Sequence, residues 1–144
     1  MPRIQIELPS TFIYKTEITV RVSDLNYGGH VGNDTMLTLL QEARINFYRS
    51  LGFRDETSFE GTVGQIIADA AVQYKAESFL GDVLVIEIGV LELSRFGFDM
   101  VYKVTNKLTT KNIAFAKTGM VCFDYATHKV AAIPQVLLEK LKSQ

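Results

Sequence analysis

A chain of 144 residues, 47% of them hydrophobic, can bury one core and is too short for two ordinary domains, so we expect one domain over residues 1–144. Its 15 basic and 16 acidic residues give a formal charge of -1, which leaves no basic face for nucleic acid. No segment has the apolar length of a signal peptide or a membrane span, which indicates a cytoplasmic protein without a membrane partner. The single cysteine, Cys122, has no second thiol for a disulfide, zinc or redox pair.

The first predicted element is a strand over residues 14–22. Its text, YKTEITVRV, alternates apolar and polar residues, which is typical of a half-buried strand. The strand leads into SDLNYGGHVGN, where Gly28, Gly29 and Gly32 permit tight or left-handed backbone among polar side chains. This loop is the least ordinary part of the sequence.

A helix is predicted over residues 34–51. Its apolar residues recur four, three, four and four positions apart, at Met36, Leu40, Ala43, Phe47 and Leu51. Asn33 or Asp34 is expected to accept the free N–H groups of the first turn, and Gly52 to form a left-handed cap at the end. Further apolar residues widen the stripe, so the helix needs burial on several sides, which a curved sheet would provide.

The remaining sequence predicts strands over residues 63–76, 82–93, 98–108 and 112–125. Residues 80–83 and 106–112 are interpreted as hairpin connections, and consecutive hairpins favour an antiparallel sheet. After Pro134 the amphipathic segment PQVLLEKLK predicts a short closing helix. The fold class is therefore α+β, with about five strands and one long helix.

Two segments carry a resemblance to a known family. Residues 20–53, VRVSDLNYGGHVGNDTMLTLLQEARINFYRSLGF, and residues 70–98, AAVQYKAESFLGDVLVIEIGVLELSRFGF, resemble hotdog-fold acyl-CoA thioesterases of the hydroxybenzoyl-CoA thioesterase type. The resemblance implies a hotdog fold, an antiparallel sheet wrapped around a long helix. It also implies a homodimer or homotetramer that binds an acyl-CoA or acyl-carrier-protein thioester at the dimer interface, without a metal or other cofactor.

Thioester hydrolysis needs a group that activates water and N–H donors that hold the developing oxyanion. In the family a backbone N–H at the start of the helix polarises the thioester carbonyl, and the matching position is Asn33. The family's Asp-x-Asp motif, whose second aspartate attacks the thioester or activates water, reads Asp24-Leu25-Asn26 here. Asn26 cannot act as a base, although its amide can orient a water.

The candidates that remain for activating water are His30, Glu42 and Asp24, and the sequence does not decide which of them faces the site. We favour His30, with Glu42 second, because an imidazole titrates near neutral pH whereas a carboxylate must be desolvated to become a strong base. Each also has a structural interpretation. His30 could bond within its own loop, Asp24 could cap loop amides, and Glu42 could be a solvated helix residue.

Substrate contacts are expected from Gly29, Val31 and Gly32, which flank His30, and from Arg95, near which relatives place basic residues for CoA phosphates. Two other functions fit the same sequence. The first is hydration or dehydration of an acyl thioester by His30 and Glu42. The second is binding of an acyl group or its carrier without turnover, which would explain why the second aspartate of the family motif is missing.

Overall fold

The computed structural model describes residues 2–144. Its elements in chain order are β1 (Tyr14–Thr19), a 3-10 turn (Val22–Asp24), α1 (Asn33–Ser50), β2 (Val63–Tyr74), β3 (Val83–Leu91), β4 (Gly97–Asn106), β5 (Asn112–Asp124), β6 (Lys129–Val130) and α2 (Gln135–Lys142). Strand and helix boundaries lie within a few residues of those predicted. The 3-10 turn and the two-residue β6 were not predicted.

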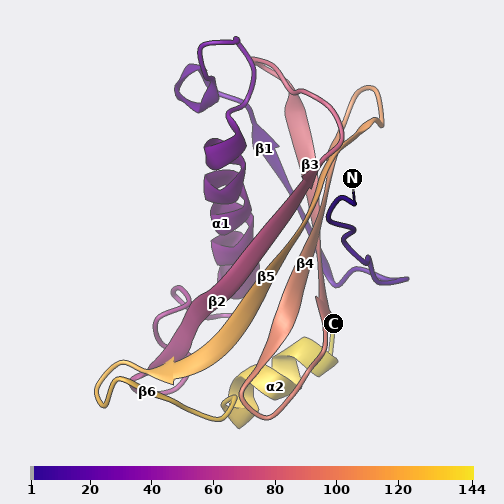
Figure 1. Cartoon of the computed structure of the whole chain (residues 1–144). Coiled ribbons are helices and arrows are strands. Elements are labelled where there is room, and N and C mark those ends of the chain that lie inside the picture. The colour runs from indigo at the N-terminus through magenta and orange to yellow at the C-terminus, as the bar shows by residue number, and fades with distance from the viewer. Residues whose placement is uncertain (1) are drawn as a thin grey trace.

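The strands form one antiparallel sheet in the order β1-β3-β4-β5-β2, and β6 pairs with β5. The long helix α1 lies along one face of this sheet, and α2 closes its lower end (Figure 1). This arrangement confirms the α+β class and the hotdog fold. Neither helix is long and apolar enough, within residues 2–144, to cross a membrane.

The apolar stripe of α1 packs on the sheet as its spacing predicted, since Met36, Leu40, Ala43, Phe47 and Leu51 are all buried. At the end of the helix Gly52 has φ +96°, the Gly52 N–H donates to the Arg49 carbonyl and the Phe53 N–H donates to the Tyr48 carbonyl. This pair of hydrogen bonds is a Schellman motif, and it confirms the predicted glycine cap. Lys140 of α2 also donates to the Leu51 carbonyl, which ties α2 to the end of α1.

Buried and partly exposed residues alternate along the central strands, and this alternation explains which face of the sheet packs against α1. Leu84, Ile86 and Ile88 of β3 are fully buried, while the residues between them are partly exposed. The hairpin prediction for residues 106–112 is confirmed by the pairing of β4 with β5. The hairpin prediction for residues 80–83 is wrong, because β2 lies at the edge of the sheet beyond β5 and β3 lies next to β1. The glycine turn there, with φ +83° at Gly81, instead ends the connection that carries the chain from β2 at one edge of the sheet to β3 near the other edge.

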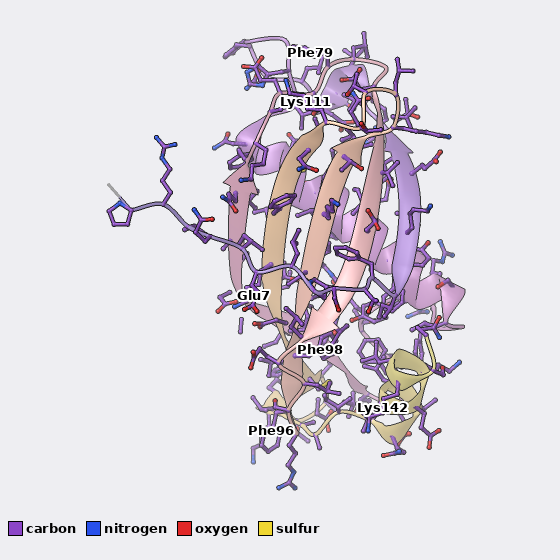
Figure 2. The ribbon with its side chains drawn as sticks, turned by 90° about the vertical axis from the view of Figure 1, so that its right-hand side faces the viewer. Glu7, Phe79, Phe96, Phe98, Lys111 and Lys142 are labelled. Carbon is purple, nitrogen blue, oxygen red and sulfur yellow. The ribbon has the colours of Figure 1, made fainter. Side chains whose placement is uncertain are left out.

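The face of the sheet opposite α1 carries the N-terminal segment, which crosses the middle strands near Glu7 (Figure 2). The Ile6 N–H donates to the side chain of Gln73 on β2 at 3.2 Å. Pro9 fills the space beside Gly89 so closely that a β-carbon on this glycine would lie 2.6 Å from Pro9 Cγ. Val101, which points to this outer face, is only 2% exposed in consequence.

A buried charge interrupts the apolar core. Arg44, on the core side of α1, is 1% exposed, and its Nε lies 2.5 Å from Oε2 of Glu56 in the α1–β2 connection. Its guanidinium also donates to the Tyr102 hydroxyl at 3.2 Å, and this hydroxyl is 2.7 Å from Oγ1 of Thr118. Burial alone would lower the pKa of Arg44, but the contacts with Glu56 and Tyr102 outweigh it and raise the pKa.

The same network reaches β2 through Gln65, whose amide donates to Glu56 at 3.1 Å and accepts from the Tyr48 hydroxyl at 2.8 Å. Burial raises the pKa of Tyr48 well above its ordinary value, so this phenol stays protonated. The network therefore joins α1, the α1–β2 connection and three strands by satisfied polar contacts inside the core.

Candidate active site

A cavity of about 430 Å³ lies where α1 begins. One wall is the loop before the helix, with Asn26, His30 and Val31, and a second is the first turn of α1, with Asn33 and Met36. The third wall is formed by residues 74–78, where β2 ends. The loop and this third wall are joined by an antiparallel bridge between His30 and Phe79, and by a hydrogen bond from the Val31 N–H to the Ser78 carbonyl at 2.9 Å.

The loop is held in shape by its own backbone. The Asn26 N–H donates to the His30 carbonyl at 2.9 Å, and the Gly29 N–H donates to the Asn26 carbonyl at 3.1 Å. Gly29 has φ +79°, a left-handed conformation that favours glycine. A β-carbon on Gly28 would lie 3.1 Å from Nε2 of His30, so the missing side chain at this position makes room for the imidazole.

Asn26 has one of its side-chain atoms occupied inside the loop. Its Oδ1 accepts the Gly28 N–H at 2.9 Å. The amide NH₂ group, with two donors, is therefore what Asn26 presents at the cavity. Asn26 could orient a water or a thioester by donating to it, and this role stays a prediction.

His30 is oriented by a hydrogen bond at one of its ring nitrogens. Nδ1 lies 3.1 Å from the Val31 carbonyl oxygen, which can only accept, so the neutral ring carries its proton on Nδ1. Nε2 then keeps its lone pair and lies 3.7 Å from Oε1 of Glu77. A free lone pair is what a general base needs. Glu77 was not predicted as a site residue.

The first turn of α1 presents free backbone amides. The N-cap is Gly32, which has no side chain to bond to them. The expectation that Asn33 or Asp34 caps the helix is wrong, because the helix begins one residue early and places Asn33 inside its first turn. Among residues 2–144 no acceptor contacts the Asn33 N–H. The positive end of an 18-residue helix thus faces the cavity with an open donor.

Tyr74, at the end of β2, fixes the same turn of α1. Its hydroxyl donates to the Asn33 carbonyl at 2.6 Å. Partial burial and the nearby Asp34 charge raise the pKa of Tyr74, so this donor keeps its proton at neutral pH. The contact spans 41 residues of sequence and had no local signal by which it could be predicted.

Three of the predicted site residues, Asp24, Glu42 and Arg95, lie away from this cavity. The buried carboxylate of Asp24 accepts from the Arg21 N–H at 2.9 Å and pairs with its guanidinium at 3.1 Å. Burial alone would raise the pKa of Asp24, but the contacts with Arg21 lower it below its usual range. Glu42 is exposed on another face of α1, beside Arg21 and Asn46.

Arg95 lies between β3 and β4, next to Phe96 and at the end of the sheet opposite Phe79 (Figure 2). Its guanidinium stacks 5.1 Å from the Phe96 ring centroid. Of the three predicted flanking contacts, Val31 lines the cavity, while Gly29 and Gly32 shape the loop around it. The roles of Arg95, Asp24 and Glu42 stay predictions. In residues 2–144 no group of three His, Cys, Asp or Glu side chains is placed to hold a metal ion.

Comparisons with known proteins agree with the fold. A protein of Aquifex aeolicus (strain VF5) named "Putative esterase" is 30% identical over 131 residues, which cover 91% of this chain and 98% of that protein. A 1,4-dihydroxy-2-naphthoyl-CoA thioesterase from Synechocystis superposes with a TM-score of 0.81 at 21% identity, covering 90% of this chain and 95% of that one. A Staphylococcus aureus protein solved in complex with CoA gives a TM-score of 0.82 at 12% identity, covering 96% and 87%.

By class, the protein is a thioester hydrolase built on the hotdog fold. The sequence profile of the thioesterase-like superfamily matches residues 20–141, which is most of the chain. The chain therefore belongs to the thioesterase-like superfamily.

Proposed function

We propose that the protein hydrolyses an acyl-CoA thioester in the cavity between residues 26–33 and the end of β2. The observation that carries this proposal is the meeting, in one cavity, of the His30 imidazole and the open N–H groups of the α1 N-terminus. Two structural neighbours support the choice of CoA, because one is named as a CoA thioesterase and another was solved with CoA.

In the proposed reaction His30 Nε2 takes a proton from water as the water oxygen bonds to the thioester carbonyl carbon. The Asn33 N–H donates to the carbonyl oxygen as negative charge gathers on it, and the helix dipole adds to this stabilisation. The Asn26 NH₂ group holds the attacking water or the thioester. The carbon–sulfur bond then breaks, and the departing thiolate takes the proton from His30, which leaves a free acid and CoA.

His30 is preferred to the two carboxylates on geometric grounds. Asp24 has both carboxylate oxygens engaged by Arg21, and Glu42 lies on a face of α1 away from the cavity. His30 lines the cavity and has a lone pair free at Nε2. The hydrolysis proposed here therefore does not need the aspartate that Asn26 replaces.

The proposed working unit is a homodimer joined along β2. This strand has 12 residues and pairs with β5 on one side, while no strand of residues 2–144 pairs with its other side. Ile67, Ala70 and Tyr74 are exposed along it. Near the start of β2 the Gln65 N–H bonds to the Glu56 carbonyl of the α1–β2 connection, and beyond it an unpaired edge with these exposed apolar residues favours pairing with a second chain. A partner there would border the cavity, because residues 74–78 continue directly from this strand.

The test is to incubate the purified protein with acyl-CoAs of several chain lengths and aromatic types and to follow the release of free thiol. Hydration of an enoyl thioester releases no thiol, so the same assay separates the two reactions. We expect thiol release by the wild type and a loss of at least about 100-fold in kcat/KM for His30→Ala. His128→Ala is the matched control, because His128 lies in the β5–β6 turn. If the protein releases no thiol from any of these thioesters, the proposal is contradicted.

A further inference from the structure

The side-chain hydroxyl of Ser78 is buried without a hydrogen-bond partner. Ser78 is 2% exposed, and within residues 2–144 its Oγ is the only fully buried side-chain nitrogen or oxygen atom that lacks a partner. Folded proteins satisfy most buried polar atoms, and an orphaned hydroxyl costs free energy unless a ligand or a water bonds to it. The protein thus keeps a donor here that its own fold does not use.

Ser78 belongs to the cavity wall that faces the start of α1. It lies opposite Val31 in the bridge whose next pair is His30 and Phe79. Residues opposite each other in such a bridge project to the same side, and consecutive residues project to opposite sides. The Ser78 hydroxyl therefore lies on the same side of the bridge as the buried Val31 side chain. The His30 imidazole lies on the other side, with the exposed Phe79 side chain.

This placement suits two different tasks on one carbonyl group. Water must approach the carbonyl carbon from one direction, while the negative charge gathers on the carbonyl oxygen. His30, Ser78 and Asn33, with its open N–H, all line this cavity, and the His30 and Ser78 side chains project from opposite sides of the bridge. No base of residues 2–144 is bonded to Ser78 Oγ, so the hydroxyl lacks the activation that a serine nucleophile requires.

We propose that the Ser78 hydroxyl is a second donor to the thioester carbonyl oxygen, beside the Asn33 N–H. This inference rests on the proposed hydrolysis. As the water oxygen bonds to the carbonyl carbon, the electron pair of the C=O double bond moves to oxygen, and the two donors hold that charge. When the double bond re-forms and the thiolate leaves, Ser78 has neither lost nor gained a proton.

The test compares Ser78→Ala and Ser78→Cys with the wild type in steady-state thiol release and in thermal unfolding. We expect Ser78→Ala to lower kcat by about 100-fold, the usual cost of one oxyanion donor, with a smaller change in KM. Its melting temperature should equal or exceed that of the wild type, because the substitution removes an unsatisfied buried hydroxyl. Ser78→Cys keeps the shape with a weaker donor, and its kcat should fall between the two.

Thr118→Val is the matched control, because the buried Thr118 hydroxyl is bonded to Tyr102 and lies outside the cavity. It should lower the melting temperature and leave kcat/KM unchanged. Wild-type activity in Ser78→Ala overturns the inference and leaves the proposed function standing. A loss of activity that comes with a lower melting temperature in both Ser78 variants assigns the residue a structural role and also overturns it. A wild type that releases no thiol from any thioester overturns both this inference and the proposed function.

Discussion

The hydroxyl of Tyr74, at the end of β2, donates a hydrogen bond of 2.6 Å to the carbonyl oxygen of Asn33, the first residue of α1. The edge strand of the sheet thereby holds the helix turn whose N–H groups face the cavity. Since an oxyanion donor works only when it is fixed in the correct direction, this contact sets the geometry on which the proposed reaction depends.

Tyr74→Phe should therefore impair hydrolysis more than stability. We expect a drop of several-fold in kcat/KM, while the free energy of unfolding changes by about 1 kcal/mol, the usual net value of one hydrogen bond. Thiol release and urea unfolding measure the two effects. Tyr125→Phe is the control, because the Tyr125 hydroxyl donates to the Gln65 carbonyl at 2.7 Å, outside the cavity. Equal activity losses in both variants would argue against a specific role for Tyr74.

The Arg44 and Glu56 pair predicts an asymmetric response to substitution. Glu56→Ala leaves the fully buried guanidinium without its counter-ion and should cost about 3–5 kcal/mol of unfolding free energy. Arg44→Met fills the space with an apolar side chain and leaves a carboxylate that is 20% exposed, so it should cost less. Urea unfolding of both single variants and of the double variant checks this order.

Arg54→Ala is the control for this series. The Arg54 and Asp55 side chains form a pair at 3.4 Å in which Arg54 is 82% exposed. Such surface pairs contribute little, so the change should stay within about 0.5 kcal/mol. A Glu56→Ala variant as stable as Arg54→Ala would show that the buried network does not hold α1 to the sheet.

The Asp24 carboxylate predicts part of the acid sensitivity of the protein. Because contacts with Arg21 lower its pKa in the folded state below the ordinary value near 3.8, Asp24 contributes stability above that value. The contribution is lost as the pH falls through the lowered folded-state pKa. Asp24→Asn should be less stable than the wild type at pH 7, and the difference should shrink as the pH falls below about 4. Thermal unfolding across this range measures it, and a constant difference would exclude the assignment.

The proposed dimer can be tested at Ile67, which is 45% exposed on the edge strand β2. Ile67→Lys places a charge beside the proposed pairing edge and should shift the protein from dimer to monomer. Leu108→Lys is the matched control, because Leu108 is 91% exposed in the β4–β5 turn. Light scattering across a concentration series gives the mass. A wild type that stays monomeric at every concentration would contradict the dimer.

Sequence periodicity predicted the elements of this fold well, because the buried faces of α1, β3 and β4 are local patterns. Leu84, Ile86 and Ile88 alternate within one strand, and the α1 stripe repeats within one helix. The position of β2 was not predictable in this way. Its partner β5 lies about 50 residues further along the chain, and the glycine turn at residues 80–83 resembles a hairpin equally well.

The candidate site was predicted in its loop and missed in its other wall. His30, Asn26 and Asn33 stand close together in the sequence, so one motif indicated all three. Tyr74, Glu77 and Ser78 reach the cavity because β2 ends beside the start of α1, and none of these residue types is unusual near a strand end. Arg44 was missed for a different reason, since its counter-ion Glu56 lies beyond the helix end and a buried arginine breaks the apolar pattern.

The N-terminal segment across the outer face of the sheet limits how the protein can build larger assemblies. Stacking two such sheets back to back would require residues 5–12 to lift away, which would expose Val101 and the space beside Gly89 to water. This cost favours growth of an assembly along the sheet edge. A variant that begins after residue 12 should therefore expose an apolar face that the intact chain covers, and it should self-associate through that face.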